Sequence, residues 1–248
     1  RFLDRAHDAD RTRAAFATMR EAGFDNVSLD LMFGLPGESV ADWEEDLRQA
    51  LAMKPDHLSC YNLTFEAGTR LERDRRQGRV SPNDDAVDRD MFLRTRELLA
   101  EHGFDAYEIS NFSGRGGPCL HNEHYWQQGD YVGVGPGAAS HRSGWRATNL
   151  KPVEAWANAV ERELPAAGTA ETLTREQRVG EALWLGLRRS TGVDMDGVER
   201  RLGVDPRARC AAAIAHYTEL GWLRIEDGRL RLTGDGLLHA DEIGAAFL

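Results

Sequence analysis

Two hydrophobic patterns alternate along the first part of the chain. Apolar residues spaced three or four positions apart predict amphipathic helices over residues 9–22, after Ser39 and over residues 84–102. Residues 26–33 and 57–63 are short apolar runs of the kind that forms buried strands. Helices that alternate with buried strands through short connections indicate right-handed crossovers and a parallel sheet or barrel.

The pattern changes between residues 104 and 150, where short aromatic segments are separated by glycine-rich stretches. Glycine allows tight turns and a close approach of the backbone to a ligand or to another strand. A polar, proline-containing stretch then predicts a boundary near residue 165, which divides the chain into domains 1–165 and 166–248.

The last part of the chain has the pattern of a small helical module. Thr174-x-x-Gln177 is a capping box that opens a helix, and further helices are predicted over residues 194–202 and 206–220. Asp227-Gly228 between two short apolar segments is a strong signal for a hairpin. Helices followed by a hairpin predict a winged-helix-like fold.

Composition narrows the class of protein. The 248 residues are 41% hydrophobic and 29% charged, as in ordinary globular domains. The net charge of −10, with only two lysines, argues against a nucleic-acid partner, because affinity for phosphate backbones comes largely from Lys and Arg. No apolar run is long enough to cross a bilayer, and no signal peptide is evident. Three widely spaced cysteines favour a reducing, cytoplasmic location.

Asp30 is the first candidate for a functional side chain. It interrupts the apolar strand 26–33, and a carboxylate there is costly unless it is paired or binds a ligand. In a parallel barrel the carboxyl ends of strands face the active site. Tyr61 holds the comparable position on the next strand. A structural role for Asp30, bonded to the backbone or to an arginine, remains open on this evidence.

Residues 119–126 form the most unusual segment, with a thiol, two imidazoles, a phenol and an indole close together. Imidazole is a common ligand of haem iron, and aromatic rings suit a flat macrocycle. The alternative is an aromatic surface loop in which His121 caps a helix. The following Gly133-x-Gly135-Pro136-Gly137 lacks the residues of a phosphate loop, so a tight turn is expected there.

Five segments together carry a family resemblance: Ser28–Gly37, Pro55–Tyr61, Tyr107–Phe112, His121-Asn122-x-x-Tyr125-Trp126 and Gly133–Ser140. Their order and spacing resemble the HemW group of radical S-adenosylmethionine (SAM) proteins, which is related to oxygen-independent coproporphyrinogen III oxidase (HemN). The His-Asn-x-x-Tyr-Trp segment is more typical of the HemW haem chaperones than of the oxidase.

The resemblance implies an α/β fold: part of a radical-SAM (β/α)6 partial TIM barrel, then a small helical, winged-helix-like C-terminal domain. It implies a haem chaperone that passes haem to an acceptor protein, with peripheral contact to membrane haem proteins as a further expectation. The alternative is oxidative decarboxylation of coproporphyrinogen III. The residues implied for SAM are Arg5, Asp30, Met32 and Tyr61, and those implied for haem are Tyr125, Trp126 and, as candidate iron ligand, His121.

The family's [4Fe-4S] cluster is bound by a Cys-x3-Cys-x2-Cys motif that this sequence does not contain. The chain also begins with Arg1 rather than Met, and its first residues resemble the interior of a domain. We therefore expect a portion of a longer protein, with the cluster ligands upstream, and we expect that these residues alone neither hold the cluster nor cleave SAM.

Overall fold

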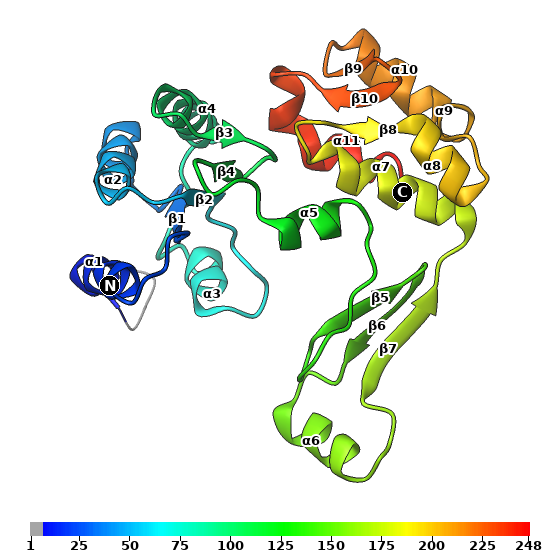
Figure 1. Cartoon of the computed structure of the whole chain (residues 1–248), viewed down its shortest axis with the longest axis horizontal. Helices are drawn as coiled ribbons and strands as arrows, with labels where there is room; N and C mark the ends of the chain where they lie inside the picture. Colours follow the sequence, from blue (N-terminus) through cyan, green and yellow to red (C-terminus); the bar gives the residue numbers. More distant parts are fainter. Residues whose placement is uncertain (1–6) are drawn as a thin grey trace. The chain divides into compact units, whose positions relative to one another are not determined.

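The computed structural model describes residues 7–248, which form two compact units divided between Pro118 and Cys119 (Figure 1). Each unit has its own hydrophobic core. No helix within the described residues is long and apolar enough to cross a membrane.

The first unit is built on a four-stranded sheet of order β1-β2-β4-β3. Its elements, in chain order, are α1 (Ala9–Glu21), β1 (Ser28–Phe33), α2 (Val40–Ala52), β2 (His57–Asn62), α3 (Arg70–Arg76), α4 (Asp85–Glu101), β3 (Asp105–Ala106) and β4 (Asn111–Ser113). β1 and β2 are parallel, as the sequence predicts, whereas β4 is antiparallel to β2, which makes the sheet mixed.

Local sequence signals determine where these helices begin. The side chain of Ser39 accepts a hydrogen bond from the backbone N–H of Asp42, and the side chain of Asp42 accepts one from the backbone N–H of Ser39. This capping box opens α2. Trp43 and Leu47 on α2 are fully buried, and the indole Nε1 of Trp43 donates to Thr95 Oγ1 on α4 at 2.7 Å. The α2–α4 contact thus combines apolar packing with a satisfied buried hydrogen bond.

The strand that carries Asp30 is not fully buried among residues 7–248, unlike the prediction. There β1 lies at the edge of the sheet, and along it Leu29 and Phe33 are buried while Ser28 and Asp30 are exposed. Within residues 7–248 only one face of β1 is covered. Asp30 therefore needs no buried partner, and its carboxylate is accessible to a ligand.

The second unit contains two three-stranded sheets, of order β5-β6-β7 and β8-β10-β9. Its elements are α5 (Leu120–Trp126), β5 (Ala139–Arg142), β6 (Trp145–Asn149), α6 (Val153–Glu161), β7 (Ala167–Thr172), α7 (Arg175–Leu187), β8 (Val193–Asp194), α8 (Met195–Leu202), α9 (Pro206–Arg209), α10 (Ala211–Glu219), β9 (Leu223–Glu226), β10 (Arg229–Leu232), the 3-10 helix η1 (Asp235–His239) and α11 (Ala240–Ala245).

The C-terminal elements from α7 to α11 share a core that includes Leu183, Met195, Leu230 and Ile243, all fully buried. The predicted capping box of Thr174 and Gln177 is confirmed. So is the hairpin of β9 and β10, whose turn has positive φ at both Asp227 and Gly228, as a type I′ turn requires.

One helix boundary in this module differs from the prediction. The single helix expected over residues 206–220 is interrupted at Cys210, whose φ of −115° and ψ of 20° lie outside the helical region. α9 and α10 are the two resulting pieces. The buried thiol of Cys210 belongs to the core of the module.

The sheet of β5, β6 and β7, with α6 inserted between β6 and β7, has little core. Between residues 139 and 172 the buried apolar side chains are those of Ala147 and Ala159. β7 is exposed along its whole length, and Val153 and Val160 on α6 are 65% and 50% exposed.

The chain divides into its two compact units after Pro118. Residues 119–165 group with the C-terminal elements because specific contacts connect them. Glu123 on α5 pairs with Arg189 at 2.6 Å, and Arg146 on β6 pairs with Glu181 on α7. The boundary near residue 165, where the barrel domain is expected to end, stays a prediction.

Candidate functional site

The carboxyl end of β1 borders a cavity of about 520 Å³, which we call the Asp30 cavity. Asp30 and Met32 both line it, two residues apart on the strand. Asp46 on α2 lines it as well, and burial, together with the negative charges of Asp42 and Glu45, raises the pKa of the Asp46 carboxyl. With Asp8, which caps α1, the cavity presents three carboxylates beside apolar surface, which suits a ligand with hydroxyl or amino donors.

Tyr61 is the register partner of Met32 on the parallel strand β2. Its ring is 41% exposed, and its hydroxyl accepts a long hydrogen bond of 3.5 Å from Asn111 Nδ2. Tyr61 is not among the residues that line the Asp30 cavity. The structure therefore brings Asp30 and Met32 to one cavity and places Tyr61 beside them at the same strand ends; Arg5 lies outside the described residues.

A buried imidazole at the start of β2 is bonded on both sides. His57 Nδ1 lies 2.9 Å from Ser28 Oγ, and His57 Nε2 lies 2.9 Å from the hydroxyl of Tyr107. Burial lowers the pKa of His57, although the negative charge of Asp30 partly opposes this. The imidazole bridges two hydroxyls and stabilises the start of β1 and β2, two residues before Asp30.

The aromatic segment singled out in the sequence forms the short helix α5. His121 and Tyr125 are one turn apart, and their rings meet edge to face with centroids 4.6 Å apart. Tyr125 contacts Tyr131 in the same way at 4.6 Å. His121 is exposed, and within residues 7–248 the structure shows no hydrogen bond to its ring. Its imidazole is therefore accessible to an iron atom from outside.

Trp126 does not share that face of α5. It follows Tyr125 directly, and its ring lies beneath the guanidinium of Arg188, 4.9 Å from the ring centroid. The helix thus presents His121 and Tyr125 on one side, and it directs Trp126 toward the residues of α7 and α8. Only two of the three residues expected to bind haem are brought into contact with each other.

The glycine-rich segment after α5 is the tight turn that the sequence predicts. Gly135 and Gly137 have φ of 103° and 70°, which only glycine adopts without strain. A Cβ on Gly133 would lie 2.2 Å from the carbonyl oxygen of Ala139. Asn149 Nδ2 donates to the carbonyls of Gly133 and Gly135 at 3.3 and 2.9 Å. These contacts make the segment a rigid support for β5.

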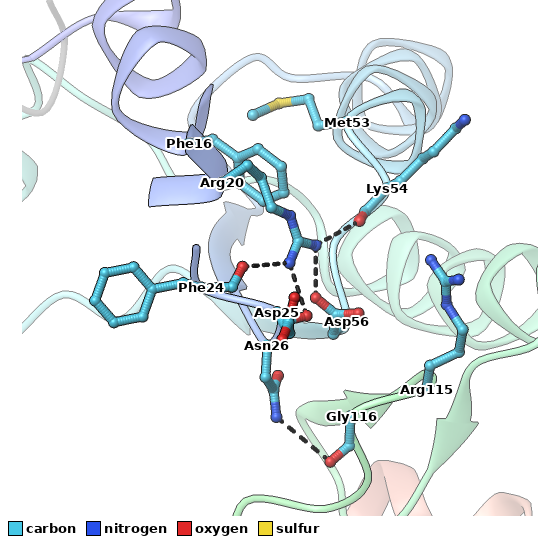
Figure 2. A pocket seen from close by; sticks show the side chains of 10 residues that line it. All are labelled: Phe16, Arg20, Phe24, Asp25, Asn26, Met53, Lys54, Asp56, Arg115 and Gly116. Carbon is cyan, nitrogen blue, oxygen red and sulfur yellow. Dashed lines mark hydrogen bonds and ion pairs between the residues drawn. The ribbon is translucent and has the colours of Figure 1, made fainter. Parts of the chain in front are cut away.

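A cavity of about 720 Å³ is lined by none of the residues predicted for SAM or haem; we call it the Phe16 cavity (Figure 2). Arg20 donates there to the carbonyls of Phe24, Asp25 and Lys54, and to Asp56 Oδ2 at 2.5 Å. Burial would raise the pKa of Asp56, but bonds from the Val27 amide and Arg20 outweigh it and lower the net pKa. The guanidinium is occupied, so it stabilises the strand ends.

The cysteines do not form a metal site. Cys60 and Cys210 are buried, and burial raises the pKa of both thiols. Across residues 7–248, no group of three or more His, Cys, Asp or Glu side chains converges as a metal site would require. The donor set for an iron–sulfur cluster is therefore not present among these residues.

Comparison with known proteins identifies relatives of this chain. Residues 173–239 match the HemN C-terminal domain. The heme chaperone HemW of Bacillus subtilis is 32% identical over 99% of this chain, and that of Mycobacterium tuberculosis is 36% identical over 97%. The chain therefore carries a HemN C-terminal domain and is similar along nearly its whole length to proteins named heme chaperone HemW. It spans 65% and 60% of the length of those two relatives.

Two further relatives extend this assignment. The mitochondrial radical S-adenosyl methionine domain-containing protein 1 of Danio rerio is 32% identical over 98% of this chain, which covers 57% of that protein. The solved structure of the radical-SAM enzyme coproporphyrinogen III oxidase (HemN) from Escherichia coli matches with a TM-score of 0.80 at 19% identity, over 98% of this chain and 59% of the other. The expected α/β fold with a HemN-type C-terminal domain is confirmed.

Proposed function

We propose that the protein to which these residues belong is a haem chaperone of the HemW type, which binds haem and transfers it to an acceptor protein. The observation that carries the proposal is the exposed His121, held edge-on by Tyr125 on a helix fixed to the HemN C-terminal domain through Glu123 and Arg189. The relatives support this proposal, because proteins named heme chaperone HemW are 30 to 36% identical to the chain along nearly its whole length.

The oxidase alternative has less support. The solved HemN structure is 19% identical to this chain, and at that level the likeness concerns the fold. The segment His121-Asn122-x-x-Tyr125-Trp126, which favours the chaperones, is intact and helical here. We therefore place haem transfer before porphyrinogen decarboxylation.

The Asp30 cavity fits the second ligand that the family implies. SAM carries ribose hydroxyls and an amino group, and the exposed carboxylate of Asp30 is an acceptor for such donors. Met32 would contact the adenosyl group, and Tyr61 would border it; the proposed contribution of Arg5 concerns a residue outside the described part. A [4Fe-4S] cluster requires cysteine thiolates that residues 7–248 do not bring together, so we assign no ligand to it here.

A haem titration tests the proposal. Ferric haem is added to the 248-residue chain and to the variants His121→Ala and His216→Ala, and the Soret band is recorded. His216 is an exposed imidazole on α10 and serves as the matched control. We expect the wild type and H216A to show the same shifted Soret maximum, and H121A to lose it with at least a tenfold weaker affinity. Identical spectra and affinities for H121A and the wild type would remove His121 as the iron ligand.

Transfer is tested separately. The haem-loaded chain is mixed with apomyoglobin, and the appearance of holomyoglobin is followed over time. Transfer faster than the release of haem to buffer supports a chaperone, and transfer no faster than that release contradicts it.

A further inference from the structure

A second cavity of interest, of about 290 Å³, lies within the second unit, and we call it the Trp126 cavity. It is lined by Trp126, Gln127, Ala182, Gly186, Arg189, Gly192, Val193, Asp194, Gly197, Val198, Arg201 and Arg229. Ala182, Val193 and Val198 belong to the core of the C-terminal module, so the floor of the cavity is apolar and well packed. Three guanidinium groups surround this floor.

The three arginines are not equally satisfied. Arg189 forms an ion pair with Glu123 at 2.6 Å. Arg229 donates only to backbone carbonyls, those of Thr191 at 2.6 Å and Gly192 at 3.0 Å. Both carbonyl oxygens are neutral acceptors, so the charge of Arg229 is not compensated by them.

Arg201 likewise lacks a carboxylate. Its Nη1 donates to the amide oxygen of Gln128 at 3.1 Å, and within the described residues the structure shows no ion pair for Arg201 or for Arg229. Burial and the nearby positive charge of Arg178 lower the pKa of Arg201. Arg201 is nevertheless exposed, so solvent screens its charge, and an anion that contacts it together with Arg229 gains a moderate stabilisation.

Two further observations favour an anionic ligand at this cavity. Asp194 is the one carboxylate among the lining residues, and it already accepts from the amide of Gly197 at 2.9 Å to cap α8. The buried indole N–H of Trp126 has no hydrogen-bond acceptor within residues 7–248. Two of the three guanidinium groups at the cavity therefore have no carboxylate partner among the described residues.

We propose that the Trp126 cavity binds a carboxylate carried on an apolar body, and that this group is a propionate side chain of the porphyrin. The second part rests on the proposed function, because haem carries two propionates on a flat apolar ring. Arg201 and Arg229 form the charged contacts, and Trp126 with the core valines accommodates the apolar part. Trp126 then contributes to porphyrin binding through the propionate end, on a different face of α5 from His121.

Metal-free porphyrins separate this contact from iron ligation. Protoporphyrin IX and its dimethyl ester, which differ in the charge and the acceptor strength of the propionates, are titrated into the 248-residue chain, and porphyrin fluorescence is followed. We expect the acid to bind about tenfold more tightly than the diester, since a hydrogen bond to a charged group contributes about a factor of ten or more. Equal affinities for the acid and the diester overturn the proposal without any mutation.

Variants assign the preference to the cavity. We expect Arg201→Gln and Arg229→Gln to reduce the acid-to-ester ratio to below about threefold, and Arg201→Lys, which keeps the charge, to retain part of it. Arg162→Gln, an exposed arginine on the C-cap of α6, is the matched control and should leave the ratio unchanged. Circular dichroism confirms that each variant is folded. An unchanged ratio in both R201Q and R229Q overturns the assignment.

The same titrations distinguish failure of this proposal from failure of the proposed function. His121→Ala should weaken haem binding and leave the protoporphyrin acid-to-ester ratio intact. If haem binding depends on His121 but no acid preference exists, the propionate contact is wrong and the haem site stands. If the preference depends on Arg201 but haem is not transferred to apomyoglobin, the contact stands and the chaperone function is wrong.

Discussion

In the Phe16 cavity of Figure 2, the guanidinium of Arg20 donates to three carbonyl oxygens and to the buried carboxylate of Asp56. In the smaller Trp126 cavity, Arg201 reaches only the amide oxygen of Gln128 within the described residues, and burial together with the nearby Arg178 lowers the pKa of Arg201. The guanidinium of Arg20 is therefore compensated by a carboxylate, whereas that of Arg201 is not. On the proposal above, the partners of each guanidinium, more than the volume of the cavity, distinguish a structural site from a binding site.

Removal of the Arg20 side chain should have the largest effect on stability. Arg20→Ala leaves Asp56, which is 5% exposed, as an uncompensated buried carboxylate. Breaking one partner of such a pair costs about 3 kcal/mol. Urea denaturation followed by circular dichroism measures it, with Arg13→Ala as control because the Arg13–Asp10 pair is exposed and its loss should cost less than about 1 kcal/mol. Equal losses for the two variants would contradict the comparison.

The Arg20–Asp56 pair also predicts that the free energy of unfolding depends on pH, with a smaller effect. The pKa of Asp56 is lower in the folded chain than its ordinary value of 3.8, so the pair contributes its full stability above about pH 4 and loses it as the pH falls through the folded pKa. The free energy of unfolding of Asp56→Asn should therefore fall less than that of the wild type between about pH 5 and pH 2. Parallel curves for the two proteins would show that Asp56 is not the group responsible.

Arg201→Gln should change stability least. The substitution removes a guanidinium that has no carboxylate partner in the described part and that is repelled by Arg178, so we expect a change within about 0.5 kcal/mol of zero in either direction. The urea midpoint checks this. A loss comparable to that of Arg20→Ala would mean that the Trp126 cavity is a structural site like the Phe16 cavity.

The sequence predicted the elements whose stability comes from repeated apolar positions. The observed ranges match the expected ones closely where the apolar period, the helix caps and the turn residues agree. This holds for α1, β1, α2, β2, α4, α7, α8 and the β9–β10 hairpin. α3 has no apolar face, and it is held by ion pairs of Glu72 with Arg75 and Arg76, which no periodicity reveals. α5 is a single short helix held by the Glu123–Arg189 pair, and β7 is exposed throughout, so neither carries a pattern.

The residues of the candidate site were also only partly predictable from the sequence. Asp30, Tyr61 and His121 could be singled out because each is an unusual residue in its local context. Arg201 and Arg229 could not, since they are two arginines among many and lie far along the chain from Trp126. Only the packing of α7, α8 and β10 brings them to one cavity. A local motif predicts the ligand class, whereas the charges around it depend on tertiary structure.

The sheet of β5, β6 and β7 buries only Ala147 and Ala159 among its apolar side chains and those of α6, so it has almost no core of its own. Opening this segment exposes little new apolar surface, and its free energy of local unfolding is correspondingly small. Its amide hydrogens should therefore exchange with deuterium long before those of α7 or α2. A thermal unfolding curve would report the two cores, while this sheet opens and closes many times below the transition.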